Sequence, residues 1–193
     1  RSIGMIPVIE IKGTTGMNDK DMSNFAKLEA KVREHDLEDK AVFISFGSGV
    51  VAYIHKNYPH YQVQFLVYDV AQGHINFAKA NQIGISMNCG YVRSRIQSII
   101  KGGVRYAACW STNSGKDYTD FAKLGLYMIT TDNLYPKNLP EVDMPEYVQN
   151  FYKEEEIRLD DKVDKLLFNE KLIKLRFKDI NNTYYSWLKI TTV

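Results

Sequence analysis

Apolar runs of strand length alternate with amphipathic helical stretches over the first two thirds of this chain. In the helical stretches, apolar side chains recur three and four residues apart, and glycine or proline often separates neighbouring segments. The predicted strands cover residues 6–13, 41–46, 63–67, 84–88, 104–110 and 126–132, and the predicted helices lie at 18–35, around 50–54, and at 71–80, 92–101 and 117–123. Because nearly every strand is followed by one helix, the pattern predicts a parallel sheet built from right-handed crossover units.

Polar side chains gather where these predicted strands end. They include Lys12, Ser45, Asp69, Asn88, residues 110–113 and residues 131–132. The carboxyl ends of parallel strands carry the active site in barrel enzymes, and an open doubly wound sheet also binds its ligands at that edge. The pattern therefore predicts the position of a site and leaves both folds open.

The first predicted strand carries two opposite charges inside an apolar run. Glu10 and Lys12 are two residues apart, so they project to the same face of an extended strand, while Ile9 and Ile11 project to the other. Burying both charges costs on the order of several kcal/mol unless they are paired, bound to a metal or turned toward a polar cavity. We interpret the pair as part of a site. The alternative is a solvated edge strand with an ordinary ion pair.

The composition changes after Tyr135. Prolines punctuate a linker, and residues 171–178 and 183–190 show the alternation of half-buried antiparallel strands. We therefore expect two parts, a barrel-like domain at 1–138 and a linker with a small β-rich appendage at 139–193. Three aromatic residues of the appendage are either packing residues or a platform for carbohydrate or a protein partner: Tyr184, Tyr185 and Trp187.

Composition narrows the functional classes. The 193 residues are 45% hydrophobic, enough for one substantial core, and 25 basic against 23 acidic side chains give a net charge of +2. Without a basic run, nothing indicates a nucleic-acid partner. Cys89 and Cys109 lack metal-site spacing and are expected in the core. No apolar run reaches the roughly 20 residues of a membrane-spanning helix. The start at Arg1, without Met, suggests a piece of a longer protein.

Four motifs, in this order along the chain, resemble the strand ends of the glycerophosphodiester phosphodiesterases. They are Glu10-Ile11-Lys12, Ser45-Phe46, Trp110-Ser111-Thr112-Asn113 and Ile129-Thr130-Thr131-Asp132. In the third motif, Ser111 stands where family members usually have Thr. The resemblance spans about residues 5–135 and implies a TIM (β/α)8 barrel of which this chain carries strands three to eight, with the first two βα units absent.

The resemblance also implies a function and a set of roles. The complete enzyme would hydrolyse a small-molecule glycerophosphodiester to glycerol 3-phosphate and an alcohol, in lipid and glycerol metabolism. Glu10 matches a carboxylate ligand of a divalent ion, calcium or magnesium, and Lys12 matches the lysine that faces the phosphate. Trp110 matches the aromatic wall beside the glycerol group, and Phe46 matches the apolar side of the pocket. One carboxylate does not hold such an ion tightly, so Glu10 is expected to be metal-free or weakly occupied.

The family's two catalytic histidines lie in the strands that this chain lacks. The chain's own histidines are His35, His55, His60 and His74, and none of them ends an apolar strand. This chain alone is therefore expected to be inactive. Two alternatives remain, a non-catalytic barrel that binds a phosphodiester or a carbohydrate, and an unrelated nucleotide-binding α/β enzyme. The sequence has no Gly-x-Gly-x-x-Gly motif after any predicted strand, which argues against the nucleotide-binding enzyme. The compartment, cytoplasm or cell envelope, and the oligomeric state are not determined by these residues.

Overall fold

The computed structural model describes residues 7–13, 16–38 and 40–132, which form a curved, purely parallel sheet. Its six strands are β1 (Val8–Glu10), β2 (Val42–Ser45), β3 (Gln62–Val67), β4 (Gly84–Asn88), β5 (Ala107–Trp110) and β6 (Met128–Ile129). They lie in the sheet in the same order as in the sequence, each paired with the next. All the carboxyl ends therefore meet at one edge.

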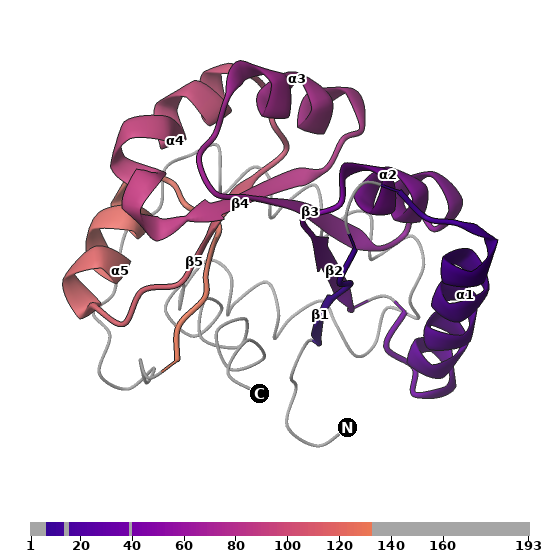
Figure 1. The fold of residues 1–193 in the computed structure, drawn as a ribbon. Coiled ribbons are helices and arrows are strands. Elements are labelled where there is room, and N and C mark those ends of the chain that lie inside the picture. Colours follow the sequence, from indigo (N-terminus) through magenta and orange to yellow (C-terminus); the bar gives the residue numbers. More distant parts are fainter. Residues whose placement is uncertain (1–6, 14–15, 39, 133–193) are drawn as a thin grey trace, which may run out of the picture.

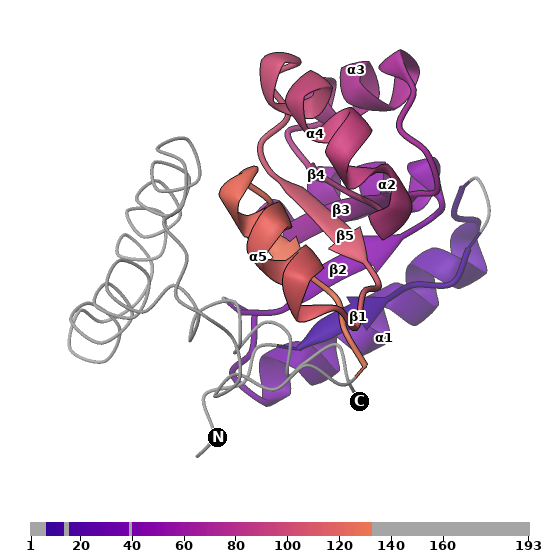
Figure 2. The ribbon, with the colours of Figure 1, turned by 90° about the vertical axis from the view of Figure 1, so that its left-hand side faces the viewer.

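The helices lie on the outer, convex side of this sheet (Figure 1). They are α1 (Asp19–Glu34), α2 (Ser48–Asn57), α3 (Gln72–Ala80), α4 (Val92–Lys101) and α5 (Gly115–Lys123), with the short 3-10 helix η1 (Cys89–Tyr91) before α4. They follow one another around the arc in chain order, and the side view shows α4 and α5 in front of the strands (Figure 2). A doubly wound sheet carries helices on both faces and reverses its strand order. The described residues do neither.

Contacts between distant strands show how strongly the sheet curls. The side-chain nitrogen of Gln64 in β3 lies 4.0 Å from the sulfur of Met128 in β6, and that of Gln62 lies 3.5 Å from the Tyr127 hydroxyl. Three strand spacings in a flat sheet amount to roughly 14 Å. Side chains therefore meet across the concave side, as in one part of a barrel wall. The α/β class and the partial-barrel shape are confirmed.

The apolar core lies between the strands and the helices. Phe43 of β2 is fully buried, and its ring packs edge-on against Phe25 of α1 and Tyr61, with centroid distances of 5.1 Å and 4.8 Å. Helix α1 begins at a capping box in which the Asn18 side chain accepts from the Asp21 amide and the Asp21 carboxylate accepts from the Asn18 amide. These bonds satisfy amides that a helix start leaves unpaired. Local sequence signals therefore set where α1 begins and which face it buries.

Helix α4 has the predicted bounds, whereas four strands are shorter than predicted: β1, β2, β5 and β6. The segment after α4 turns through Gly103, whose φ is +73°, and the Val104 amide still bonds to the Ile99 carbonyl. This closing turn of the helix uses the first part of the run at 104–110, so β5 begins only at Ala107. β6 is reduced to two residues and β1 ends at Glu10, and among the described residues each of these two edge strands pairs with one neighbour.

Two predictions about the rest of the chain remain predictions. The boundary at residue 138 and the β-rich appendage at 139–193 lie outside the described residues. Within the part of the chain that is described, no helix combines the length and the hydropathy needed to span a membrane.

Candidate active site

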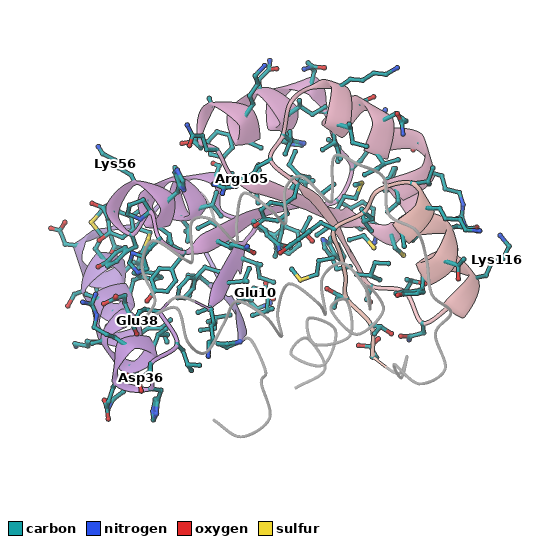
Figure 3. All side chains as sticks on the ribbon, turned by 180° about the vertical axis from the view of Figure 1, so that it is seen from behind. Glu10, Asp36, Glu38, Lys56, Arg105 and Lys116 are labelled. Carbon is teal, nitrogen blue, oxygen red and sulfur yellow. The ribbon has the colours of Figure 1, made fainter. Side chains whose placement is uncertain are left out.

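Glu10 and Lys12 form an ion pair where β1 ends. The Lys12 Nζ donates to Glu10 Oε1 at 2.7 Å. Glu10 lies in register with Ile44 of β2, which lies in register with Gln64 of β3, so it belongs to the concave face. Figure 3 shows Glu10 inside the arc, whereas Lys56 and Lys116 point away from it. The shared face of the two charges is thus confirmed.

The sequence pattern predicts that both charges are buried on one face of the strand, but the two side chains differ in exposure. The Glu10 side chain is 29% exposed and the Lys12 side chain 83% exposed. The reason is that the ladder to β2 ends with the bond from the Ile11 amide to the Ile44 carbonyl, so Lys12 stands beyond the paired strand. In the described residues, Lys12 is therefore a solvated cation at the rim of the sheet, and Glu10 is the partly buried member of the pair.

Ser45 connects the end of β2 to the end of β1. Its hydroxyl donates to the Ile11 carbonyl at 2.7 Å and accepts from the Gly47 amide at 3.1 Å. Both hydrogen bonds are made with main-chain groups, and the Ser45 side chain is fully buried. Phe46, the next residue, is 48% exposed. The Ser-Phe motif therefore places a buried linking hydroxyl beside an exposed ring.

Four aromatic side chains line the carboxyl edge, and we call them the aromatic rim: Phe46, Tyr68, Tyr91 and Trp110. The Trp110 ring lies 5.6 Å from that of Phe46 and 5.9 Å from that of Tyr68, and Tyr68 lies 5.7 Å from Tyr91, all edge to face. The Trp110 indole nitrogen donates to the Ser86 carbonyl at 3.2 Å. Phe46 follows β2 and Trp110 ends β5, so their contact depends on the curl of the sheet.

Asp69 and Arg95 form a two-pronged ion pair beside the rim. Arg95 Nε and Nη2 donate to the two carboxylate oxygens of Asp69 at 2.7 Å and 2.8 Å. The Arg95 bonds, aided by the Val70 amide, lower the pKa of Asp69, so that carboxyl stays ionised at neutral pH. Asp69, which the sequence placed among the polar strand ends, is therefore engaged by Arg95 of α4.

Thr112 and Asn113 form hydrogen bonds with backbone and side-chain groups near the ends of β5 and β6. The Thr112 hydroxyl donates to Asp117 at 3.0 Å and accepts from the Ser114 amide at 3.2 Å, at the start of α5. The Asn113 side-chain oxygen accepts from the Thr131 hydroxyl and the Asp132 amide, both at 2.9 Å. These bonds tie the end of β5 to the segment after β6. The residues of the third and fourth motifs therefore also have a structural role, which is to connect the segments that follow β5 and β6.

None of the four histidines is the last residue of a strand. His35 caps the end of α1, and His55 lies in α2, where burial and the nearby Arg105 lower its pKa. The His74 Nδ1 accepts from the Ala71 amide at 3.1 Å at the start of α3, and the His60 ring packs on Tyr61. His35, His60 and His74 thus make local structural contacts, and His55 is a helix residue.

The described residues do not form a site for a hard divalent ion. Nowhere in the described ranges do three or more His, Cys, Asp or Glu side chains gather in a way that would hold a metal. Calcium takes six to eight oxygen ligands, and magnesium also needs several. Glu10 offers one carboxylate, and Lys12 already donates to it. The other ligands that the family resemblance implies would have to come from elsewhere.

Sequence reasoning missed Tyr68, Tyr91 and Arg95. Tyr68 directly follows the buried strand β3 and precedes Asp69, which is a usable signal, because an aromatic side chain just past a strand end stands at the binding edge. Tyr91 ends a 3-10 helix and Arg95 lies in a helix, so their sequence positions carry no such signal.

The strand order, the outer helices and the lined carboxyl edge define a half-barrel of the (β/α) class. Comparison with solved structures agrees: a glycerophosphodiester phosphodiesterase from Parabacteroides distasonis superposes with a TM-score of 0.52 at 16% identity, over 79% of this chain and 58% of that one. A protein assigned as the same enzyme from Galdieria sulphuraria gives a TM-score of 0.50 at 16% identity, over 75% and 56%.

The likeness concerns the fold. The chain spans a little under three fifths of the length of these two structures. No protein-family model matches the sequence, and the comparison with curated proteins finds no match. The structures that the fold resembles are thus phosphodiesterases, as the sequence motifs indicated, and their activity is attributed to this chain only as a proposal.

Proposed function

We propose that this chain supplies strands three to eight of the barrel of a glycerophosphodiester phosphodiesterase. The whole enzyme would hydrolyse a glycerophosphodiester to glycerol 3-phosphate and an alcohol. The observation that carries the proposal is the Glu10–Lys12 pair at the end of β1, inside a half-barrel whose other strand ends present Phe46 and Trp110. A cation and apolar rings at one edge suit a substrate with a phosphate and a carbon backbone.

Each residue has a role that its position supports. Lys12 is exposed and carries three donors, so it can keep its bond to Glu10 and donate to a phosphate oxygen as well. Glu10 then holds the Lys12 ammonium in place, and this preorganisation favours binding of the phosphate. Phe46 and Trp110 would form the apolar wall of the glycerol pocket. Proton transfer would fall to the two histidines that the family resemblance places in strands one and two of the barrel, so the chain alone is expected to be inactive.

In the complete enzyme, Glu10 would supply one ligand to a calcium or magnesium ion, which would neutralise phosphate charge when bound. The 193-residue chain should bind neither ion tightly. Isothermal titration calorimetry is expected to give dissociation constants weaker than about 100 μM for both, because one carboxylate is too few. Sub-micromolar binding to the chain would contradict this expectation, and a Glu10→Gln variant would then show whether Glu10 is a ligand.

The family resemblance implies a first strand that ends in His-Arg-Gly and a second strand with a Glu-x-Asp pair. The test of the function uses the chain joined to two preceding βα units that carry these motifs. Glu10→Gln is expected to lower kcat/KM for glycerophosphodiester hydrolysis by at least about tenfold, because the substitution removes a charge that interacts with Lys12 and the ion. The matched control is Glu34→Gln, an exposed carboxylate on α1 paired with Lys31, which should change kcat/KM less than about twofold. Equal effects of the two substitutions would contradict the role of Glu10.

The second candidate is a barrel module that binds a phosphodiester or a carbohydrate without hydrolysing it. The exposed rings of Phe46 and Tyr68 at the carboxyl edge fit such a binding surface. The coding sequence upstream of Arg1 separates the two candidates. His-Arg-Gly and Glu-x-Asp motifs there favour the enzyme, and their absence favours the binding module.

A further inference from the structure

The exposed aromatic surface of the described residues is concentrated at the site. Of the large hydrophobic side chains that the structure describes, only Phe46 and Tyr68 are exposed, at 48% and 62%. Phe46 follows β2 and Tyr68 follows the neighbouring strand β3, and both rings contact Trp110 at the end of β5, while Tyr91 contacts Tyr68. Such a concentration of exposed rings at the carboxyl edge of a barrel wall marks a binding surface.

The charges and polar groups beside this surface are already matched with each other. Asp69 and Arg95 neutralise one another through two short hydrogen bonds. The indole nitrogen of Trp110 donates to the Ser86 carbonyl, and the Asn88 side-chain oxygen accepts from the Gly90 amide. Besides the Tyr68 and Tyr91 hydroxyls, these groups leave for a ligand the faces and edges of the four rings, which bind apolar and ring-bearing groups through area and ring geometry.

We propose that the Tyr68–Tyr91 end of the aromatic rim is the subsite for the leaving alcohol, and that these two rings select alcohols with an uncharged, apolar or ring-bearing group. This inference rests on the proposed function, in which Lys12 faces the phosphate and Phe46 and Trp110 border the glycerol group. The rim extends from Phe46 and Trp110 to Tyr68 and Tyr91, so a diester with its glycerol end at the first two rings directs its other end along the last two.

The test measures binding to the 193-residue chain by fluorescence. The chain has two tryptophans, so a Trp187→Phe background leaves Trp110 as the reporter. The titrants are three glycerophosphodiesters, with benzyl alcohol, choline and serine as the alcohol. The benzyl diester is expected to bind at least about fivefold more tightly than the other two, a ratio that one well-formed ring contact supplies. Equal binding of all three, tighter binding of the choline diester, or no response to the benzyl diester would overturn the inference.

Two substitutions at Tyr68 separate the ring from its hydroxyl. Tyr68→Ala should abolish the preference for the benzyl diester, and Tyr68→Phe should retain it, because the ring remains. Tyr68 is largely exposed, so both variants should unfold at nearly the same temperature as the parent, which circular dichroism checks. A preference that survives Tyr68→Ala would contradict the role of this residue.

A Lys12→Ala variant distinguishes this inference from the proposed function. If both hold, Lys12→Ala weakens the three diesters by a similar factor and the benzyl preference persists. Similar weakening without any benzyl preference would refute the rim subsite alone. A benzyl preference with no effect of Lys12→Ala would instead refute the phosphate-binding role of Lys12, and with it the phosphodiesterase assignment.

Discussion

Replacing Phe43 by alanine is expected to lower the free energy of unfolding by about 3–5 kcal/mol. Phe43 is fully buried in β2, and its ring packs edge to face on Phe25 and Tyr61. The substitution would remove the apolar contact between β2, α1 and the segment before β3, and would leave a cavity that the surrounding rings fill only in part. A domain of this size has a total stability of about 5–15 kcal/mol, so urea unfolding followed by circular dichroism would detect the loss easily.

The matched control is Phe46→Ala, three residues further along the same segment. Phe46 is 48% exposed and has its ring contact with Trp110 at the edge of the sheet, so its removal should cost about 1 kcal/mol or less. If the two substitutions cost the same, the assignment of Phe43 to the core side of β2 and of Phe46 to the binding edge would be wrong.

Alanine at Gly84 is expected to destabilise the chain by about 2–3 kcal/mol through a clash on the concave face. A Cβ at this position would lie 2.3 Å from Tyr106 Cε2 and 2.5 Å from its Cζ. The Tyr106 hydroxyl donates to the Val63 carbonyl at 3.1 Å, so the ring is held in place and cannot move away freely. Thermal and urea unfolding of the Gly84→Ala variant measure the effect.

Two comparisons sharpen this prediction. Gly73→Ala in α3 meets nothing within 4 Å and should raise stability by up to about 1 kcal/mol, as alanine does in a helix. Combining Gly84→Ala with Tyr106→Ala should cost at least about 1 kcal/mol less than the sum of the single substitutions, because the truncated ring no longer clashes. Additive costs would show that the Gly84 effect has another origin.

The proposals about function depend on the same concave side. Glu10, Ile44, Gln64 and Gly84 occupy matching positions on successive strands, so the residue that carries the ion pair and the residue that accommodates Tyr106 share one face. Substitutions at Gly84 would therefore disturb the concave face of the sheet, whereas substitutions at Tyr68 test the exposed carboxyl edge. Measuring stability and binding for both keeps structural and functional effects apart.

Much of the site was predictable because it follows from topology. Once the alternation of strand and helix predicts parallel strands, the residues after each strand must meet at one edge. The family resemblance then selected Glu10, Phe46 and Trp110 among the residues near that edge. The roles of Thr112 and Asn113 were not predictable in this way. Their hydrogen bonds run to Asp117 and to the segment after β6, and these partners become known only when the loops are placed.

The sequence by itself determined the elements, their order and the edge at which the polar and aromatic residues gather, because hydrophobic periodicity, capping residues and glycine stops act over a few neighbouring positions. Only the tertiary structure decided that the sheet curls far enough for Phe46 to touch Trp110, that Tyr68 and Tyr91 complete the rim, and that Lys12 stands in solvent. Curvature and exposure result from packing between strands that are distant in the chain, and no local pattern records those contacts.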